Sequence, residues 1–191
     1  MRYLSKDERR EAILQAAMRV ALAEGLAAMT VRRIATEAGV ATGQVHHHFA
    51  SGGELKSLAF VRLIRELLDA DVADERATWR ERLHSMLGSD DGKFEPYIRL
   101  WREAQILASR DPEIKAAYVL TMEMWHHETV VIIRAGAEAR AFTLTDLAEN
   151  IAWRLIGLVC GLDGITVLNM PEMDDAALNK HLDKLITLEL F

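Results

Sequence analysis

The chain lacks the residues and motifs that build most enzyme sites. Cys160 is its only cysteine, which excludes an intramolecular disulfide, a redox pair of thiols and a zinc cluster held by thiolates. It has no glycine-rich phosphate loop, nucleophile elbow or pair of catalytic acids. We therefore expect neither an enzyme nor a bound cofactor or metal, and Cys160 is best explained by packing within an apolar stripe.

A second absence concerns membranes and export. No apolar run approaches the roughly 20 residues that a helix needs to cross a bilayer. The N-terminal stretch, MRYLSKDERREAILQ, carries charges where a signal peptide needs an apolar core. We therefore expect a cytoplasmic protein that has no membrane partner.

Proline is scarce, with three residues, and no stretch alternates apolar and polar residues as a strand does. Half of the residues are hydrophobic and 27% are charged, a balance typical of a globular protein. Apolar residues recur instead at helical spacing. We predict an all-α fold, with short helices up to about residue 50, a linking helix around 55–67 and five longer helices beyond residue 72.

The net charge of −6 is unevenly distributed. Residues 1–50 hold seven Lys and Arg against five acids, or +2, together with three histidines, whereas the rest holds 16 basic and 24 acidic residues, or −8. A mildly cationic N-terminal part on an acidic body suits a protein whose N-terminal part meets nucleic acid and whose body does not.

Cap residues predict where the N-terminal helices begin and end. Ser5 is placed as the N-cap of a helix that ends at Gly25, and Thr30 as the N-cap of a second helix that ends at Gly39. A third helix is expected over Thr42–Phe49. The last two helices are only about two turns long and are separated by a tight turn.

The segment VRRIATEAGVATGQVHHHFA, residues 31–50, has the apolar pattern of a helix-turn-helix. We expect Ala35 to face the partner helix and Val45 to be buried between the two helices. We expect Gly39 to end the first of these helices with φ > 0. The apolar seam is completed by Ile34, Val40 and Phe49. Gln44 can then pair with adenine, and one of Arg32 and Arg33 should contact phosphate, while Arg32 is a candidate for guanine.

Residues 9–60 resemble the N-terminal domain of the TetR family of bacterial transcriptional regulators. The matching residues are Ile13, Ala16 and Ala17, together with the segments Glu24–Gly25, Thr30–Ala35, Ala38–Val40, Val45–Phe49 and Glu54–Leu55. The resemblance implies a helix-turn-helix DNA-binding domain at 1–52 and a helical effector-binding and dimerisation domain at 53–191. The DNA-binding residues that we predict are Thr30, Arg32, Arg33, Thr42, Gly43, Gln44, His46, His47, His48 and Lys56.

The chain departs from the family pattern at three positions. His46 replaces a tyrosine that packs on the DNA backbone, and Gly52 replaces a lysine that contacts phosphate. Ala41 replaces the Ser or Thr that caps the recognition helix, which leaves Thr42 as a substitute cap. We expect an altered sequence preference rather than loss of DNA binding, with Lys56 supplying one phosphate contact.

The resemblance further implies a homodimer on a pseudo-palindromic operator, with repression relieved when a small molecule enters the body and shifts the linking helix. A long apolar stripe at 147–165 and the last helix, 174–190, are the candidates for the dimer interface. Its predicted residues are Gly157, Leu158, Gly161, Leu162, Ile165, Leu178, Leu182 and Leu185. The alternative is that both stripes pack inside one subunit.

Aromatic and polar residues of the middle helices are candidates for an effector pocket. They are Tyr97, Trp101, Gln105, Tyr118, Met122, Trp125, His126 and Trp153. An aromatic pocket could hold an apolar molecule or an organic cation. The segments around Trp101 and Leu162–Gly164 are similar to the choline-responsive regulators of the family, although such residues more often belong to an ordinary core.

Two other functions are compatible with the sequence. One is a metal-responsive sensor built on His126 and His127 with Glu123, which requires that further ligands converge on His127. The histidine run 46–48 cannot easily share one metal because consecutive helical residues point in different directions. The other is an architectural DNA-binding protein without an effector, which a closed body would favour.

Overall fold

The computed structural model describes residues 5–70, 76–88 and 94–191, and in these residues the fold is helical, without a strand. The all-α prediction is confirmed. The chain divides into two compact units, Met1–Leu67 with Gly92–Met122 and Leu68–Asp91 with Glu123–Phe191. The predicted domain boundary after residue 52 differs from this division and stays a prediction. Each unit is described by itself.

The first unit begins with α1 (Lys6–Glu24), and its boundaries are those that the cap residues predict. The Ser5 hydroxyl accepts a hydrogen bond from the Glu8 amide (3.2 Å), while the Glu8 carboxylate accepts one from the Ser5 amide (2.7 Å). This reciprocal capping box satisfies two N–H groups at the start of the helix. Gly25 ends α1 with φ 87°. A 3₁₀ turn, η1 (Leu26–Ala28), follows and was not predicted.

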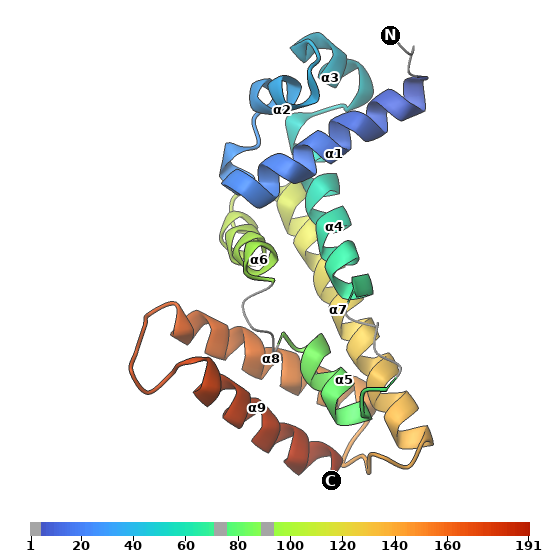
Figure 1. Ribbon diagram of the computed structural model, residues 1–191, viewed down its shortest axis with the longest axis vertical. Helices are drawn as coiled ribbons and strands as arrows, with labels where there is room; N and C mark the ends of the chain where they lie inside the picture. The colour runs from blue at the N-terminus through green and yellow to red at the C-terminus, as the bar shows by residue number, and fades with distance from the viewer. Residues whose placement is uncertain (1–4, 71–75, 89–93) are drawn as a thin grey trace. The chain divides into compact units, whose positions relative to one another are not determined.

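The next two helices, α2 (Val31–Ala38) and α3 (Thr42–His48), form the predicted helix-turn-helix. The Thr30 hydroxyl caps α2 by accepting from the Arg33 amide at 3.1 Å. Gly39 ends α2 in the left-handed conformation, φ 66° and ψ 34°, as predicted. We call α1 to α3 the head. In Figure 1, α2 and α3 lie on one side of α1.

The first unit also contains α4 (Gly52–Ala70) up to Leu67, α6 (Glu95–Leu107) and the beginning of α7 (Pro112–Glu138). These helices lie on the other side of α1 from α2 and α3 (Figure 1), and α6 packs directly on α1 and η1. A fully buried core holds them together, with Ile13, Leu26, Leu55, Phe60, Leu100 and Ile114 among its largest side chains.

The second unit contains α5 (Trp79–Met86), the rest of α7, α8 (Ala148–Thr166) and α9 (Asp175–Leu190). The helices α8 and α9 pack against each other as an antiparallel hairpin (Figure 1). With α5, α6 and α7, they make the five helices predicted beyond residue 72. The apolar stripe was predicted to include Leu147, but α8 begins one residue later and Leu147 is 67% exposed. None of the described helices is long and apolar enough to cross a membrane.

Candidate nucleic-acid interface

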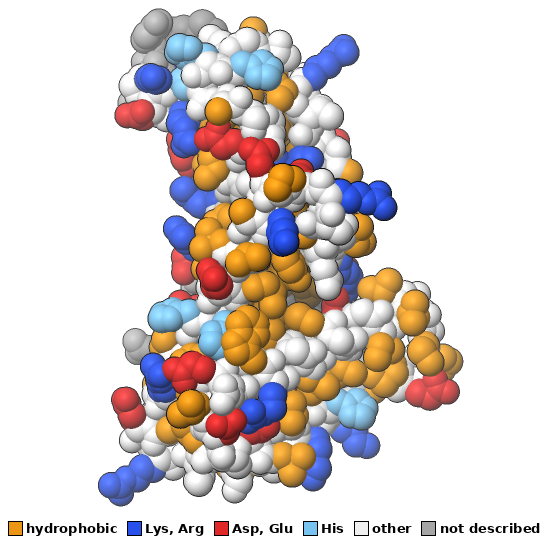
Figure 2. All heavy atoms as spheres, turned by 180° about the vertical axis from the view of Figure 1, so that it is seen from behind, with side chains coloured by type: hydrophobic (Ala, Val, Ile, Leu, Met, Phe, Trp, Pro, Cys, Tyr) orange, Lys and Arg blue, Asp and Glu red, His pale blue; other side chains and the backbone are white. Residues whose placement is uncertain are grey.

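The helix-turn-helix is held together by the apolar seam that the sequence predicts. Ile34, Ala35, Val45 and Phe49 are all buried, and Val40 is half-buried. Because Val45 points inward, the residues around it on α3 point outward: Thr42, Gly43, Gln44, His46 and His47 are exposed. The outer face of α3 is therefore open to a partner. Figure 2 shows histidine side chains at the surface of this head, whose only histidines are 46–48.

Gln44 has a partner that the sequence analysis missed. The Arg9 guanidinium on α1 donates a hydrogen bond from Nη1 to the Gln44 side-chain oxygen at 3.3 Å. The neighbouring Arg10 lies over the Phe49 ring, 4.7 Å from its centroid. The basic pair in the first helix was the only sequence signal for these contacts. The Gln44 oxygen can accept one further hydrogen bond, and its amide group can still donate two.

The three histidines are not equivalent. His46 and His47 are exposed, whereas His48 is half-buried and its ring meets His47 edge-on at 5.3 Å. Its Nδ1 is shielded from solvent and has no hydrogen-bond partner among the described residues. Burial lowers the pKa of His48, and the positive charges of His47, Lys6, Arg9 and Arg10 lower it further. His48 is thus the histidine least suited to carry a positive charge to phosphate.

Arg32 and Arg33 differ in the same way. The Arg33 guanidinium pairs with Glu24 at 2.6 Å and with Glu37 at 3.1 Å, and these contacts raise its pKa. Glu37 also accepts from Arg19 at 3.0 Å. Arg32 is exposed and makes no such ion pair within the described part of the chain. Of the two arginines, one of which was predicted to contact phosphate, Arg32 is therefore the better placed.

Two of the departures from the family pattern lie where helices begin, at the start of α3 and at the start of α4. The N-cap of α3 is Ala41, and neither it nor Thr42 supplies a side-chain cap, so the substitute expected from Thr42 is not seen. Gly52 opens α4, and Lys56 follows on its second turn, half-buried. The start of α3 thus presents backbone N–H groups that no side chain of this helix end satisfies.

The predicted pocket residues divide between the two units. In the first, the Trp101 ring lies edge-on to Tyr118 (6.1 Å) and to Phe60 on α4 (6.5 Å), so one aromatic cluster joins α4, α6 and α7. Phe60 was not among the predicted residues. Tyr97 instead contacts Phe94 at 6.4 Å. Gln105 is exposed and Met122 is half-buried.

In the second unit, Trp125 is buried and its indole N–H donates to the Met86 carbonyl at 2.7 Å, which joins α7 to α5. The His126 ring stacks on Trp153 with centroids 4.3 Å apart, and its Nε2 lies 3.0 Å from the Glu149 carbonyl oxygen. Trp153 is 46% exposed. Of the predicted residues in this unit, His126 and Trp153 come together, while Trp125 has a packing role.

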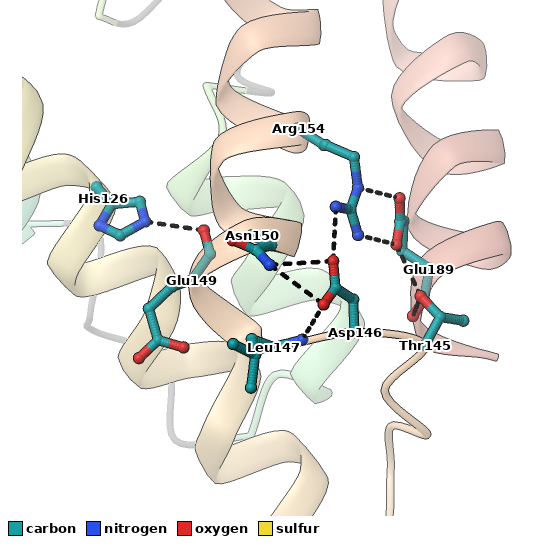
Figure 3. Close-up of polar contacts among 8 residues, drawn as sticks. All are labelled: His126, Thr145, Asp146, Leu147, Glu149, Asn150, Arg154 and Glu189. Atoms are coloured by element: carbon teal, nitrogen blue, oxygen red, sulfur yellow. Dashed lines mark hydrogen bonds and ion pairs between the residues drawn. The ribbon is translucent and has the colours of Figure 1, made fainter.

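A polar network connects α8, α9 and the loop before α8 (Figure 3). Arg154 on α8 pairs with Glu189 on α9 at 2.6 Å and with Asp146 in the preceding loop at 2.9 Å. Thr145 adds a 2.8 Å hydrogen bond to Glu189. The Arg154 contact is the main reason that the pKa of Glu189 is lowered. The network ties the two helices of the hairpin and the loop together.

The predicted dimer residues fall into three groups. Among the described residues, nothing outside the backbone of α8 itself lies within 4 Å of where a Cβ of Gly157 or Gly161 would stand, so this side of the helix is open. Leu162 and Leu182, in contrast, are buried within the subunit. Half-buried positions make up the rest, namely Leu158, Ile165, Leu178 and Leu185.

The metal-sensor alternative gains no support from these contacts. The His126 ring is used in stacking and in its contact with a backbone carbonyl. Among residues 5–70, 76–88 and 94–191, no three His, Cys, Asp or Glu side chains are grouped so that they could hold a metal ion.

Comparison with known proteins agrees with this architecture. The family model described as "Bacterial regulatory proteins, tetR family" matches residues 13–55. The HTH-type transcriptional regulator BetI of Rhizobium meliloti is 30% identical over 159 residues, which cover 81% of this chain and 75% of the relative. The HTH-type transcriptional repressor KstR2 of Mycobacterium tuberculosis is 31% identical over 162 residues, covering 78% and 76%.

A solved structure is similar over almost its whole length. It is a transcriptional regulator from Saccharomonospora viridis, crystallised in complex with choline, with 26% identity and a TM-score of 0.73 over 96% of this chain and 98% of that one. The helix-turn-helix, the helical body and these relatives agree with one another. The chain belongs to the TetR family of bacterial transcriptional regulators, and it is a DNA-binding protein rather than an enzyme.

Proposed function

We propose that this chain is a cytoplasmic, homodimeric repressor that binds a pseudo-palindromic operator and is released from it by a small organic cation of the quaternary ammonium class. The observation that carries the proposal is the open outer face of α3, with Thr42, Gln44, His46 and His47 exposed around the buried Val45. A helix of this kind can enter the major groove, where its side chains reach base edges.

The dimer is supported by the α8–α9 hairpin. Its exposed apolar side chains include Trp153, Val167, Leu168, Met170 and Leu188. Figure 2 shows apolar side chains gathered at the far end of this hairpin. Gly157 and Gly161 add a stretch of α8 that another helix can approach closely. Two subunits with a twofold axis would place two recognition helices on successive major grooves, roughly 34 Å apart.

The effector class is supported by two observations. The Saccharomonospora viridis regulator was crystallised with choline and is similar to nearly the whole of this chain. Within the first unit, Phe60, Trp101 and Tyr118 form an aromatic cluster on the three helices that adjoin the head. Aromatic faces attract quaternary ammonium groups through cation–π interactions.

The experiment that tests the proposal has two steps. The purified protein is first used to select bound sequences from random duplex DNA at near-physiological salt. The recovered duplex is then titrated with choline and, as a matched control, with 3,3-dimethylbutan-1-ol, its neutral isostere. We expect an inverted repeat, release by choline and little release by the neutral isostere, since only choline carries the charge that aromatic rings attract.

Each part of the proposal can fail separately. Recovery of a single half-site or of no motif would contradict the dimeric repressor. An inverted repeat that choline does not release would leave the repressor and remove the proposed effector. Equal release by both compounds would assign the effector site to apolar packing instead of cation–π attraction.

A further inference from the structure

Two carboxylates, on α6 and α7, contact two turns of the chain beside the helices of the head. Glu103 on α6 contacts the turn that follows α1, and Glu113 on α7 contacts the turn that leads from α3 into α4. All of these residues belong to the first unit. Neither acid figures in the predicted DNA-binding or effector sites, and neither contact is used by the function proposed above.

The Glu103 contact is part-buried. Its carboxylate accepts a hydrogen bond of 2.6 Å from the amide of Leu26, a residue that is itself fully buried. The carboxylate also lies against Gly25, where a Cβ would overlap it, and Gly25 has φ 87°. The hydrogen bond to Leu26 and the close approach to Gly25 both place this carboxylate directly against the turn. From the same helix, Arg99 donates to the Leu22 carbonyl at 2.6 Å, which adds a second bond to the end of α1.

The Glu113 contact is at the turn between α3 and α4. The Ser51 hydroxyl donates to the Glu113 carboxylate at 3.1 Å and accepts from the Glu54 amide at 2.8 Å, so Ser51 both caps α4 and holds Glu113. A Cβ built at Gly53 would overlap the same carboxylate. A side chain at position 53 would therefore push the flexible end of Glu113 away from its contact with Ser51. The amide of Glu113 is itself held by Asp111 at 3.0 Å, which fixes the start of α7.

We infer that Glu103 and Glu113 are positioning residues that hold the head in its DNA-binding orientation against α6 and α7. We call the two contacts the latches. Each latch lies on a helix that contributes to the aromatic cluster, since Trp101 shares α6 with Glu103 and Tyr118 shares α7 with Glu113. A molecule that displaces either ring moves the helix that carries a latch. The inference rests on the proposed function because it specifies how the body regulates DNA binding.

The test compares Glu103→Ala and Glu113→Ala with two charge-matched controls. Glu95→Ala removes an acid of α6 whose carboxylate pairs with Arg102 on the same helix, and Glu123→Ala removes an exposed acid of α7. Removal of an acid by itself favours DNA binding, because it lowers repulsion of the phosphates. We expect the controls to bind the selected operator as well as wild type or better, whereas each latch variant binds about fivefold or more weakly.

A second variant addresses the latch geometry without removing an acid. Gly53→Ala places a methyl group where the Glu113 carboxylate lies, so it should weaken operator binding in the wild-type background. In the Glu113→Ala background the same substitution meets no carboxylate and should have little further effect. Additive losses in the double variant would contradict the Glu113 latch.

Head orientation is measured without DNA. Spin labels are placed at two exposed positions of the first unit, Thr36→Cys on α2 and Ala116→Cys on α7, in a Cys160→Ala background. Double electron–electron resonance is recorded with labelled subunits diluted into unlabelled protein. Wild type and controls should give one narrow distance distribution, and the latch variants a broader or shifted one. A thermal unfolding curve is recorded for each variant to check that it is folded.

The outcomes separate this inference from the proposed function. The inference is overturned if the latch variants give the same distance distribution as wild type. It is also overturned if their distance distribution changes while their operator affinity does not. Loss of affinity without a change in distance assigns the acids another role and also overturns it. If wild type selects no operator, the proposed function fails, and the distance distributions alone decide whether the latches hold the head.

Discussion

Arg32 and Arg33 are adjacent in the sequence, yet the fold gives them different environments. Arg33 turns toward Glu24 and Glu37, and both of these contacts raise its pKa, Glu24 more than Glu37. To bind a phosphate it would have to give up these partners. Arg32 lies exposed on the first turn of the same helix, with no ion pair in the part of the chain that the structure describes. Nearby acids thus decide which of the two arginines is available to contact a DNA phosphate.

This difference predicts opposite effects of two alanine substitutions. Arg32→Ala should weaken binding to all operator sequences alike and should lower the slope of log K against log salt by about one, because one phosphate contact is lost. Arg33→Ala should change the salt slope little and should lower the melting temperature, since it leaves two acids close together. The measurements are operator affinity from 50 to 300 mM salt, roughly the range over which phosphate contacts are resolved, and thermal unfolding. A larger salt effect for Arg33→Ala would reverse the assignment.

At the scale of helices, the predictable features are those with local causes. The caps Ser5 and Thr30, and Gly39 with its positive φ, act within a few residues, and they set the ends of α1 and α2 as predicted. Val45 and Phe49 followed from apolar spacing alone. The 3₁₀ turn after Gly25 was not predicted, and the carboxylate that accepts from its first amide, that of Glu103, is 77 residues away from Leu26 in the sequence.

The same reasoning explains what could not be predicted at the site. Glu113 meets Ser51 across 62 residues, and no spacing rule links two such positions. Arg9 reaches Gln44 across 35 residues for the same reason. A single sequence shows which face of a helix is apolar, but it does not show which exposed acid or base lies opposite a given residue after folding. The polar partners of the head therefore had to come from the structure.

The recognition helix α3 offers a prediction about an element. Its N-cap, Ala41, has an extended backbone (φ −72°, ψ 147°) and no side-chain cap. A serine fits this conformation and can accept from the second or third amide of the helix, so Ala41→Ser should raise the free energy of unfolding by about 1 kcal/mol. Chemical denaturation measures this change.

Ala41→Asp is the matched comparison for DNA binding. Aspartate caps as well as serine does, so both variants should be stabilised. Aspartate also adds a negative charge beside the face that meets DNA, so it should weaken operator binding where serine does not. Equal operator affinities of the two variants would show that the start of α3 lies away from the phosphates.

At the scale of the whole molecule, the hairpin α8–α9 has a side that a single subunit does not use. Gly157 and Gly161 have open space beside them, and Trp153, Leu168 and Leu188 are exposed. The alternative explanation, that both apolar stripes are satisfied within one subunit, holds for Leu162 and Leu182, which are buried. The stripes thus serve the subunit core on one side and leave the glycine side open.

Gly161→Arg distinguishes these explanations. An arginine at this open position fits the isolated subunit, and replacing glycine within a helix favours that helix by about 0.5–1 kcal/mol, so a monomeric protein should be as stable as before or more so. In a dimer that brings two helices together here, the long charged side chain should separate the subunits. We expect sedimentation velocity to show dimers of wild type and of the control Ala116→Arg, an exposed position on α7, and monomers of Gly161→Arg.

The Gly161→Arg variant should also lose high-affinity binding to a full inverted repeat while its binding to a half-site is unchanged. Dimeric Gly161→Arg with full operator affinity would place the interface elsewhere on the molecule.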